Sequence, residues 1–219
     1  MDGVTSPRAK DWLLTPDNAV ITFIDYQPDQ YAGVGSMPVD ELLVNVTTLG
    51  RLVSAYELPV VLSTVGKKMR GMKGTNEELH AALNHAPEID RNTLNSWEDP
   101  DFRAAVEKTG RRKLIVAGLW TEICVAFPVL DALHEGYEVY VVEDAIGGVS
   151  KTAHDAAMRR MEQAGARPIT VIGRRVAARL EPPRRRPPAR RAAGLVWRPP
   201  RAQARRLKPR GVARATSST

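Results

Sequence analysis

The chain has 219 residues, 43% of them hydrophobic, which is enough for one sizeable α/β domain. Its single cysteine excludes an intrachain disulfide, and no uninterrupted apolar run approaches the roughly 18 residues that a membrane helix needs. The N-terminus lacks the long apolar segment of a signal peptide. We therefore expect a cytoplasmic protein that does not associate with membranes.

The formal net charge of +7 combines two regions of opposite sign. Residues 174–219 hold fourteen Arg and one Lys against a single Glu, a net charge of +14, which leaves −7 for residues 1–173. The same region holds seven of the 16 prolines, and paired prolines among repelling arginines cannot build a packed core. We predict a domain at 1–173 and a disordered Arg/Pro-rich tail at 174–219.

Two origins of this tail stay open. The composition changes abruptly after Gly173, as it would if a GC-rich coding region were read in a shifted frame. A selected basic tail would instead bind nucleic acid through the phosphates, with an affinity that falls steeply with salt.

Within the first region, short apolar runs alternate with helical patterns. Strands are expected at residues 19–25, 58–65, 113–117, 138–142 and 168–172. Helices are expected at 40–56 with Asp40 as candidate N-cap, from Thr75 with Glu78 at capping-box spacing, at 99–109 with Pro100 first and Gly110 at the end, at 121–135 closed by Gly136, and at 151–164. This alternation predicts a three-layer Rossmann-like α/β fold, whose mostly parallel sheet of about six strands is flanked by helices.

The only cysteine, Cys124, follows the strand expected at 113–117 and stands near the start of the next helix. Open α/β sheets bind ligands at the carboxyl ends of their strands, and the partial positive charge of a helix N-terminus favours a thiolate. These features predict a nucleophile with a low thiol pKa. The alternative is a small buried apolar residue, since free cysteine is often buried.

Two further polar side chains stand near expected strand ends. Asp25 ends the first apolar run, and Arg91 lies in the connection that includes residues 90–97. Taken singly, the first is typical of a turn or cap and the second of a solvated loop.

Together these residues lie in segments that resemble the isochorismatase-like cysteine hydrolases, especially their YcaC-like branch. The matching pieces are IDYQ at 24–27, LNSWED at 94–99, GLWTEICVAFP at 118–128, EDA at 143–145 and QAGA at 163–166. The resemblance covers about seven tenths of the chain, from residue 19 to 172, and the cysteine segment is its most specific part.

The resemblance implies a catalytic set of Asp25, Arg91 and Cys124 that cleaves C–N bonds of small amide-type substrates through a thioester. Arg91 occupies the position of the family lysine, and members of the YcaC-like branch carry arginine there. Arginine keeps its charge and cannot exchange a proton near neutral pH, so we expect it to stabilise the thiolate and orient Asp25. The oxyanion hole would consist of the backbone N–H groups of Trp120 and Cys124.

The resemblance also implies a non-proline cis peptide at Leu119–Trp120 and a homo-oligomer. Substrate-binding residues would be Trp97, Trp120 and Thr121, although both tryptophans could equally belong to the core. No histidine forms the Asp-x-His pattern of metal-binding relatives, so we expect neither a metal nor another cofactor. The alternative function is a catalytically impaired family member whose basic tail binds nucleic acid or other anions.

Overall fold

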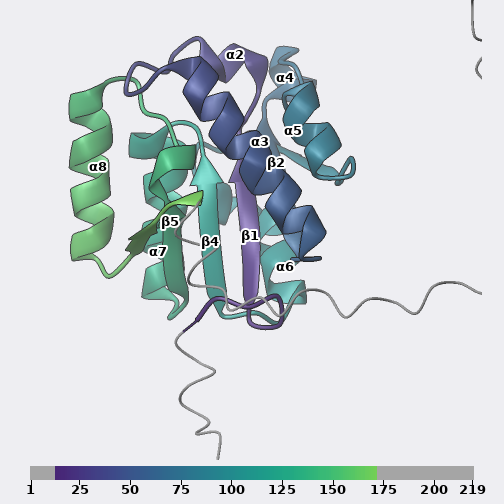
Figure 1. The fold of residues 1–219 in the computed structure, drawn as a ribbon, viewed down its shortest axis with the longest axis vertical. Coiled ribbons are helices and arrows are strands. Elements are labelled where there is room, and N and C mark those ends of the chain that lie inside the picture. Colours follow the sequence, from purple (N-terminus) through teal and green to yellow (C-terminus); the bar gives the residue numbers. More distant parts are fainter. Residues whose placement is uncertain (1–12, 172–219) are drawn as a thin grey trace, which may run out of the picture. The chain divides into compact units, whose positions relative to one another are not determined.

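The computed structural model describes residues 13–171, which form a six-stranded, entirely parallel sheet between two layers of helices (Figure 1). The strands are β1 (Ala19–Ile24), β2 (Val60–Val65), β3 (Glu88–Arg91), β4 (Lys113–Gly118), β5 (Glu138–Val142) and β6 (Arg167–Ile169), in the spatial order β3-β2-β1-β4-β5-β6. The predicted Rossmann-like architecture is confirmed.

Every residue of the two central strands, β1 and β4, is buried. A parallel strand that is covered on both faces needs a continuous apolar run, and the sequences AVITFI and KLIVAG supply it. These strands pair along their full length, from Ala19 beside Lys113 to Ile24 beside Gly118. The order of the strands reverses between them, and ligands bind at such a point in open α/β sheets.

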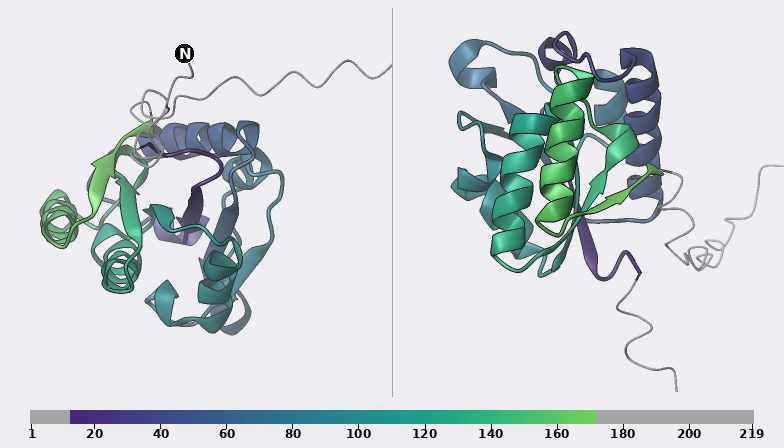
Figure 2. Two further views of the ribbon diagram at one scale, coloured as in Figure 1. Left: turned by 90° about the horizontal axis from the view of Figure 1, so that it is seen from below. Right: turned by 90° about the vertical axis from the view of Figure 1, so that its left-hand side faces the viewer.

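The helices form two layers. Helix α3 (Val39–Ala55) lies across one face of the sheet, where it packs against α5 (Glu77–Ala82), and α6 (Pro100–Lys108) and α7 (Ala126–His134) cover the opposite face (Figure 2, left). Helix α8 (Lys151–Gln163) packs against α7. The short elements are α2 (Pro28–Tyr31), α4 (Lys67–Arg70), η1 (Ser96–Glu98), the π-helical turn η2 (Thr121–Val125) and η3 (Glu143–Ala145).

The predicted helix ends are partly confirmed. Asp99 caps α6 by accepting hydrogen bonds from two backbone N–H groups, and Pro100 is its first residue. Helix α3 instead begins at Val39, so the prediction of Asp40 as N-cap is wrong and Asp40 lies in the first turn. Helix α5 is capped by Asn76 rather than opened by Thr75, because the Asn76 Oδ1 accepts from the N–H groups two and three residues ahead.

Strand β3 was not expected, and it places Arg91 at the end of a strand rather than in a connection. Its sequence EIDR carries three charges and no periodic apolar signal, and it is held at the edge of the sheet by backbone pairing to β2. Strand β6 begins at Arg167, one residue before the predicted start, and ends at Ile169.

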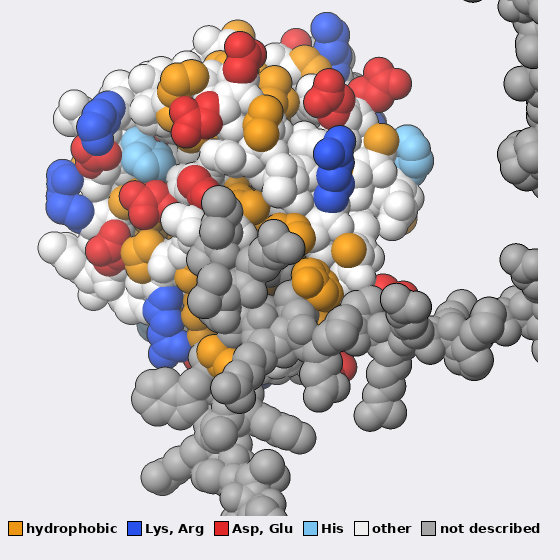
Figure 3. All heavy atoms as spheres, viewed as in Figure 1, with side chains coloured by type: hydrophobic (Ala, Val, Ile, Leu, Met, Phe, Trp, Pro, Cys, Tyr) orange, Lys and Arg blue, Asp and Glu red, His pale blue; other side chains and the backbone are white. Residues whose placement is uncertain are grey.

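The predicted tail at 174–219 and its boundary with the domain lie outside the described residues. Within residues 13–171, no helix is long and apolar enough to cross a membrane. Figure 3 shows side chains of both charges interspersed with small apolar areas on the visible face. The large apolar side chains that are exposed in this part are Val44, Met69, Leu94 and Val149.

Candidate active site

The fold brings Asp25, Arg91 and Cys124 to the carboxyl-end side of the sheet. Asp25 directly follows β1, Arg91 is the last residue of β3, and Cys124 lies in η2, shortly after β4. All three side chains are buried, with relative exposures of 0%, 1% and 5%. The parallel strands therefore assemble in space three groups that lie far apart in the sequence.

Arg91 and Asp25 form an ion pair with no solvent exposure of either side chain. The Arg91 Nη2 donates to the Asp25 Oδ2 at 2.6 Å, and the Nη1 donates to the backbone carbonyl of Thr93 at 3.0 Å. Asp25 itself has a φ of +61°, a left-handed conformation that is uncommon for residues other than glycine. Because a buried carboxylate needs a partner, Arg91 is what permits Asp25 to be ionised here.

Burial raises the pKa of Asp25 from 3.8 to about 6, although Arg91 opposes this through its charge and its hydrogen bond. The Cys124 thiol also interacts with the carboxylate and lowers the Asp25 pKa. This contact is looser than the ion pair, since the Asp25 Oδ1 has no partner within normal hydrogen-bond geometry among the described residues. At neutral pH Asp25 is mostly ionised, with a basicity suited to accepting a proton.

Burial raises the pKa of the Cys124 thiol to about 12, and the negative charge of Asp25 adds to the rise. The charge of Arg91 and a hydrogen bond from the Trp120 backbone N–H act in the opposite direction. The expectation of a low thiol pKa is therefore wrong, because desolvation outweighs the position at a helix start. In the resting protein the proton resides on the sulfur, beside a carboxylate that can take it.

The turn that carries Cys124 has an unusual backbone. The peptide bond between Leu119 and Trp120 is cis, which confirms that prediction, and the Val125 N–H donates to the Trp120 carbonyl at 3.2 Å. The expected helix at 121–135 begins as the π-helical turn η2 and becomes α-helical only at Ala126. Pro128 has no N–H to donate to the carbonyl four residues earlier, which accounts for the irregular start.

The three predicted substrate-binding residues have different surroundings. The Trp97 ring lies 5.3 Å from the Tyr137 ring and 6.4 Å from the Phe102 ring, contacts that favour the core alternative. The Trp120 side chain is half-buried, and its Nε1 donates to the Gln30 carbonyl at 3.0 Å. Thr121 is fully buried.

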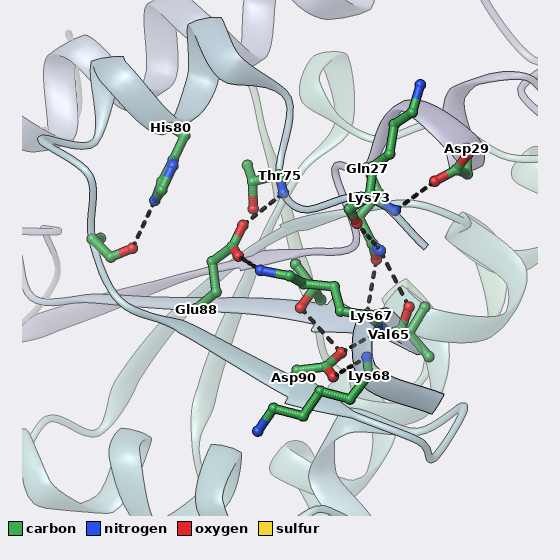
Figure 4. A network of polar contacts seen from close by, with 12 residues as sticks. Gln27, Asp29, Val65, Lys67, Lys68, Lys73, Thr75, His80, Glu88 and Asp90 are labelled. Carbon is green, nitrogen blue, oxygen red and sulfur yellow. Dashed lines mark hydrogen bonds and ion pairs between the residues drawn. The ribbon is translucent and has the colours of Figure 1, made fainter. Parts of the chain in front are cut away.

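A buried glutamine fixes the neighbouring strand ends to each other. The Gln27 Oε1 accepts from the Val65 N–H at 2.8 Å, and its Nε2 donates to the Lys73 carbonyl at 2.7 Å (Figure 4). The Lys73 N–H in turn donates to Asp29. The position of Gln27, two residues after Asp25 in the matched IDYQ segment, was the only sign of its importance in the sequence.

Asp90 supports the same region from β3. Its carboxylate accepts hydrogen bonds from the backbone N–H groups of Lys67 and Lys68, each at 2.9 Å (Figure 4). The Gly66 N–H donates to the Arg91 carbonyl at 2.8 Å. The connection after β2 is thereby anchored beside Arg91, a role for Asp90 that no sequence pattern indicates.

No group of three or more His, Cys, Asp or Glu side chains within residues 13–171 is arranged to hold a metal ion. That the protein uses no metal stays a prediction. A shallow depression between α3 and α5, lined in part by Arg51, Glu78 and Asn84, includes none of the predicted site residues.

Residues 19–172 match the isochorismatase domain family. The chain belongs to the isochorismatase family. It is 37% identical over 162 residues to the probable hydrolase YcaC of Escherichia coli, and the aligned segment covers 73% of this chain and 77% of that protein. Membership of this family makes the protein a hydrolase.

Solved structures of the isochorismatase family agree with the fold. The E. coli YcaC structure, described as an octameric hydrolase of unknown specificity, has a TM-score of 0.71 at 36% identity and covers 75% of this chain and 81% of its own. YcaC from Pseudomonas aeruginosa, solved with hexane-2,5-diol and covalent acrylamide, has a TM-score of 0.69 at 36% identity and covers 73% and 79%.

Proposed function

We propose that this isochorismatase-family protein hydrolyses C–N bonds of small amide-type substrates through a thioester on Cys124. The observation that carries the proposal is that a buried thiol, Cys124, and a buried carboxylate, Asp25, which is itself paired to Arg91, lie together at the carboxyl-end side of the sheet. A cysteine nucleophile needs an adjacent base, and a base is best when its pKa lies near the working pH. With a pKa of about 6, Asp25 meets that condition.

The reaction begins when Asp25 takes the proton from Cys124 as the sulfur attacks the substrate carbonyl carbon. Arg91 remains positively charged throughout and offsets the negative charge that moves from the carboxylate to the sulfur and then to the substrate oxygen. The backbone N–H groups of Trp120 and Cys124 would bind that oxygen. Support for Trp120 is its place directly before η2, the turn that carries Cys124. One lost oxyanion donor typically costs about 10²–10³ in rate.

The tetrahedral intermediate collapses when the C–N bond breaks and Asp25 returns its proton to the leaving nitrogen. A water molecule then attacks the thioester, and Asp25 accepts one of its protons. The acid is released and the thiol regains its proton from Asp25. Asp25 thus serves twice as base and twice as acid, while Arg91 transfers no proton.

Two features of the relatives extend the proposal. Covalent acrylamide in P. aeruginosa YcaC is an unsaturated amide, and addition to a thiol is its usual reaction with proteins, which supports a reactive cysteine here. The octameric state of E. coli YcaC supports a homo-oligomer. The impaired, anion-binding alternative rests on residues 174–219, outside the described part, and stays a prediction.

The test is ammonia release from a panel of small primary amides, ureido compounds and carbamoyl compounds. We expect turnover of at least one by the native chain and none by Cys124→Ala. Mass spectrometry of the quenched reaction should detect an acyl group on the peptide that contains Cys124. Turnover that survives in Cys124→Ala would refute the cysteine mechanism.

A further inference from the structure

Helix α8 contacts η2 through a hydrogen bond between two side chains. The His154 Nδ1 lies 2.9 Å from the Thr121 Oγ1, and these residues are 33 positions apart in the chain. Thr121 is the first residue of η2, the turn that also contains Cys124, and α8 packs directly against η2. The bond therefore links α8 to the turn that carries Cys124.

Thr121 is held at a second point by its backbone. Its N–H donates to the Gly147 carbonyl at 3.0 Å, and the preceding Leu119 forms an isolated parallel bridge with the same Gly147. Trp120 lies between these two attachments. The backbone that leads into the Cys124 turn therefore depends on both attachments staying in place.

The base of the His154 side chain is closely packed against the loop that contains Gly148. A Cβ atom added to Gly148 would lie 3.1 Å from the His154 Cβ and 2.6 Å from the Glu122 Oε2. The Glu122 Oε1 accepts from the Val149 N–H at 3.0 Å, which holds the same loop against η2. Close packing on this side holds the first atoms of the His154 side chain beside the loop that contains Gly148.

The ionisation of His154 favours the neutral ring. Burial lowers its pKa, as does the charge of Lys151, while Asp155, Glu143 and Glu122 act in the opposite direction. In the neutral ring Nδ1 can accept the proton of the Thr121 hydroxyl.

We propose that His154 is a positioning residue: through the Thr121 hydroxyl it holds the start of η2, the turn that carries Cys124. This inference rests on the proposed function, since it concerns the same nucleophile. The side-chain hydrogen bond of His154 is with Thr121 rather than with the sulfur or the Asp25 carboxylate, so its effect is indirect.

The experiment compares two substitutions that place a polar group at different positions. In His154→Asn the side-chain amide can reproduce Nδ1, whereas in His154→Gln it reproduces Nε2 instead. Thr121→Val removes the hydroxyl at nearly constant volume. The readout is the second-order rate of acrylamide addition to Cys124, followed by intact mass as a function of pH on the full chain.

We expect His154→Gln and Thr121→Val each to slow acrylamide addition about ten-fold at a fixed pH, which is the order of effect of losing one hydrogen bond that holds the turn. The rise of rate with pH should move to higher pH in both, because a turn that is held less firmly stabilises the thiolate less well. His154→Asn should stay close to the native rate. The double variant His154→Gln/Thr121→Val should be no slower than either single variant, because both substitutions remove the same hydrogen bond.

Equal slowing by His154→Asn and His154→Gln would overturn the proposal, because it would indicate a packing role. Unchanged rates in all variants would overturn it as well. The proposed hydrolysis is tested by a different result. A native chain that adds acrylamide at Cys124 but releases ammonia from no amide would refute the hydrolytic function, and the rates of the His154 variants would still test the positioning role.

Discussion

Replacing Arg91 by Met removes the cation that permits Asp25 to be ionised inside the protein. In the native chain burial raises the Asp25 pKa to about 6 even though Arg91 lowers it through its charge and a 2.6 Å hydrogen bond. Without that opposition only the weaker thiol contact still lowers it, so the Asp25 pKa should rise well above 6. The base would then be protonated at neutral pH.

The size of the effect follows from the burial of the pair. For the native chain, a rise in the Asp25 pKa from 3.8 to about 6 corresponds to about 3 kcal/mol of stability that is present below 3.8 and lost as the pH rises through 6. Arg91→Met should lose more, since breaking a buried pair typically costs about 3–5 kcal/mol. This additional loss should shrink toward about pH 5, where Asp25 is protonated in both proteins.

The assays are urea unfolding at about pH 5 and pH 8 and the pH profile of acrylamide addition to Cys124. We expect the free energy of unfolding of Arg91→Met to fall below that of the native chain mainly at the higher pH. The first rise in addition rate, near pH 6 in the native chain, should move upward, so that the rate at neutral pH falls about ten-fold or more.

Arg103→Met is the matched control. Arg103 pairs with Glu107 and Glu135, but its side chain is 44% exposed, and exposed pairs contribute little. It should leave both the unfolding and the addition profile nearly unchanged. The reasoning would be refuted if Arg91→Met kept the native midpoint near pH 6, or lost the same stability at both pH values.

Three further predictions use the same protein. The raised thiol pKa of Cys124 implies that iodoacetamide alkylation without substrate still accelerates between about pH 9 and 11; a plateau near pH 8.5 would contradict the buried protonated thiol. In Gly33→Ala the new Cβ would lie 2.6 Å from the Trp120 ring, so the ring must shift. The near-ultraviolet circular dichroism spectrum and the rate of acrylamide addition should both change, and an unchanged spectrum would contradict the shift of the ring. Deleting residues 174–219 should leave acrylamide addition unchanged but abolish any salt-sensitive DNA binding measured by fluorescence anisotropy; binding that persists without the tail would assign it to the domain.

Much of the fold could be predicted because its signals are local. Buried parallel strands require apolar runs, which can be seen in the sequence. The start of α6 is marked by Asp99 and Pro100 and its end by Gly110, all within a dozen positions. Strand β3 escaped prediction because its pairing to β2 supplies what its charged sequence lacks. The start of α5 was also predicted wrongly, at Thr75. Two neighbouring polar residues, Thr75 and Asn76, could each cap a helix, and the folded backbone places Asn76 at the cap.

The sequence by itself determined that a parallel α/β sheet forms, and that Asp25 and Cys124 follow two of its strands. It also carried the family resemblance that assigned Arg91 to the same site. Only the tertiary structure decided that Arg91 and Asp25 form a fully buried ion pair, that the Cys124 thiol has a raised rather than a lowered pKa, and that His154 contacts the turn that carries Cys124. Strand and helix signals depend on neighbours along the chain, whereas desolvation and charge pairing depend on groups that folding brings together from 33 to 66 residues apart.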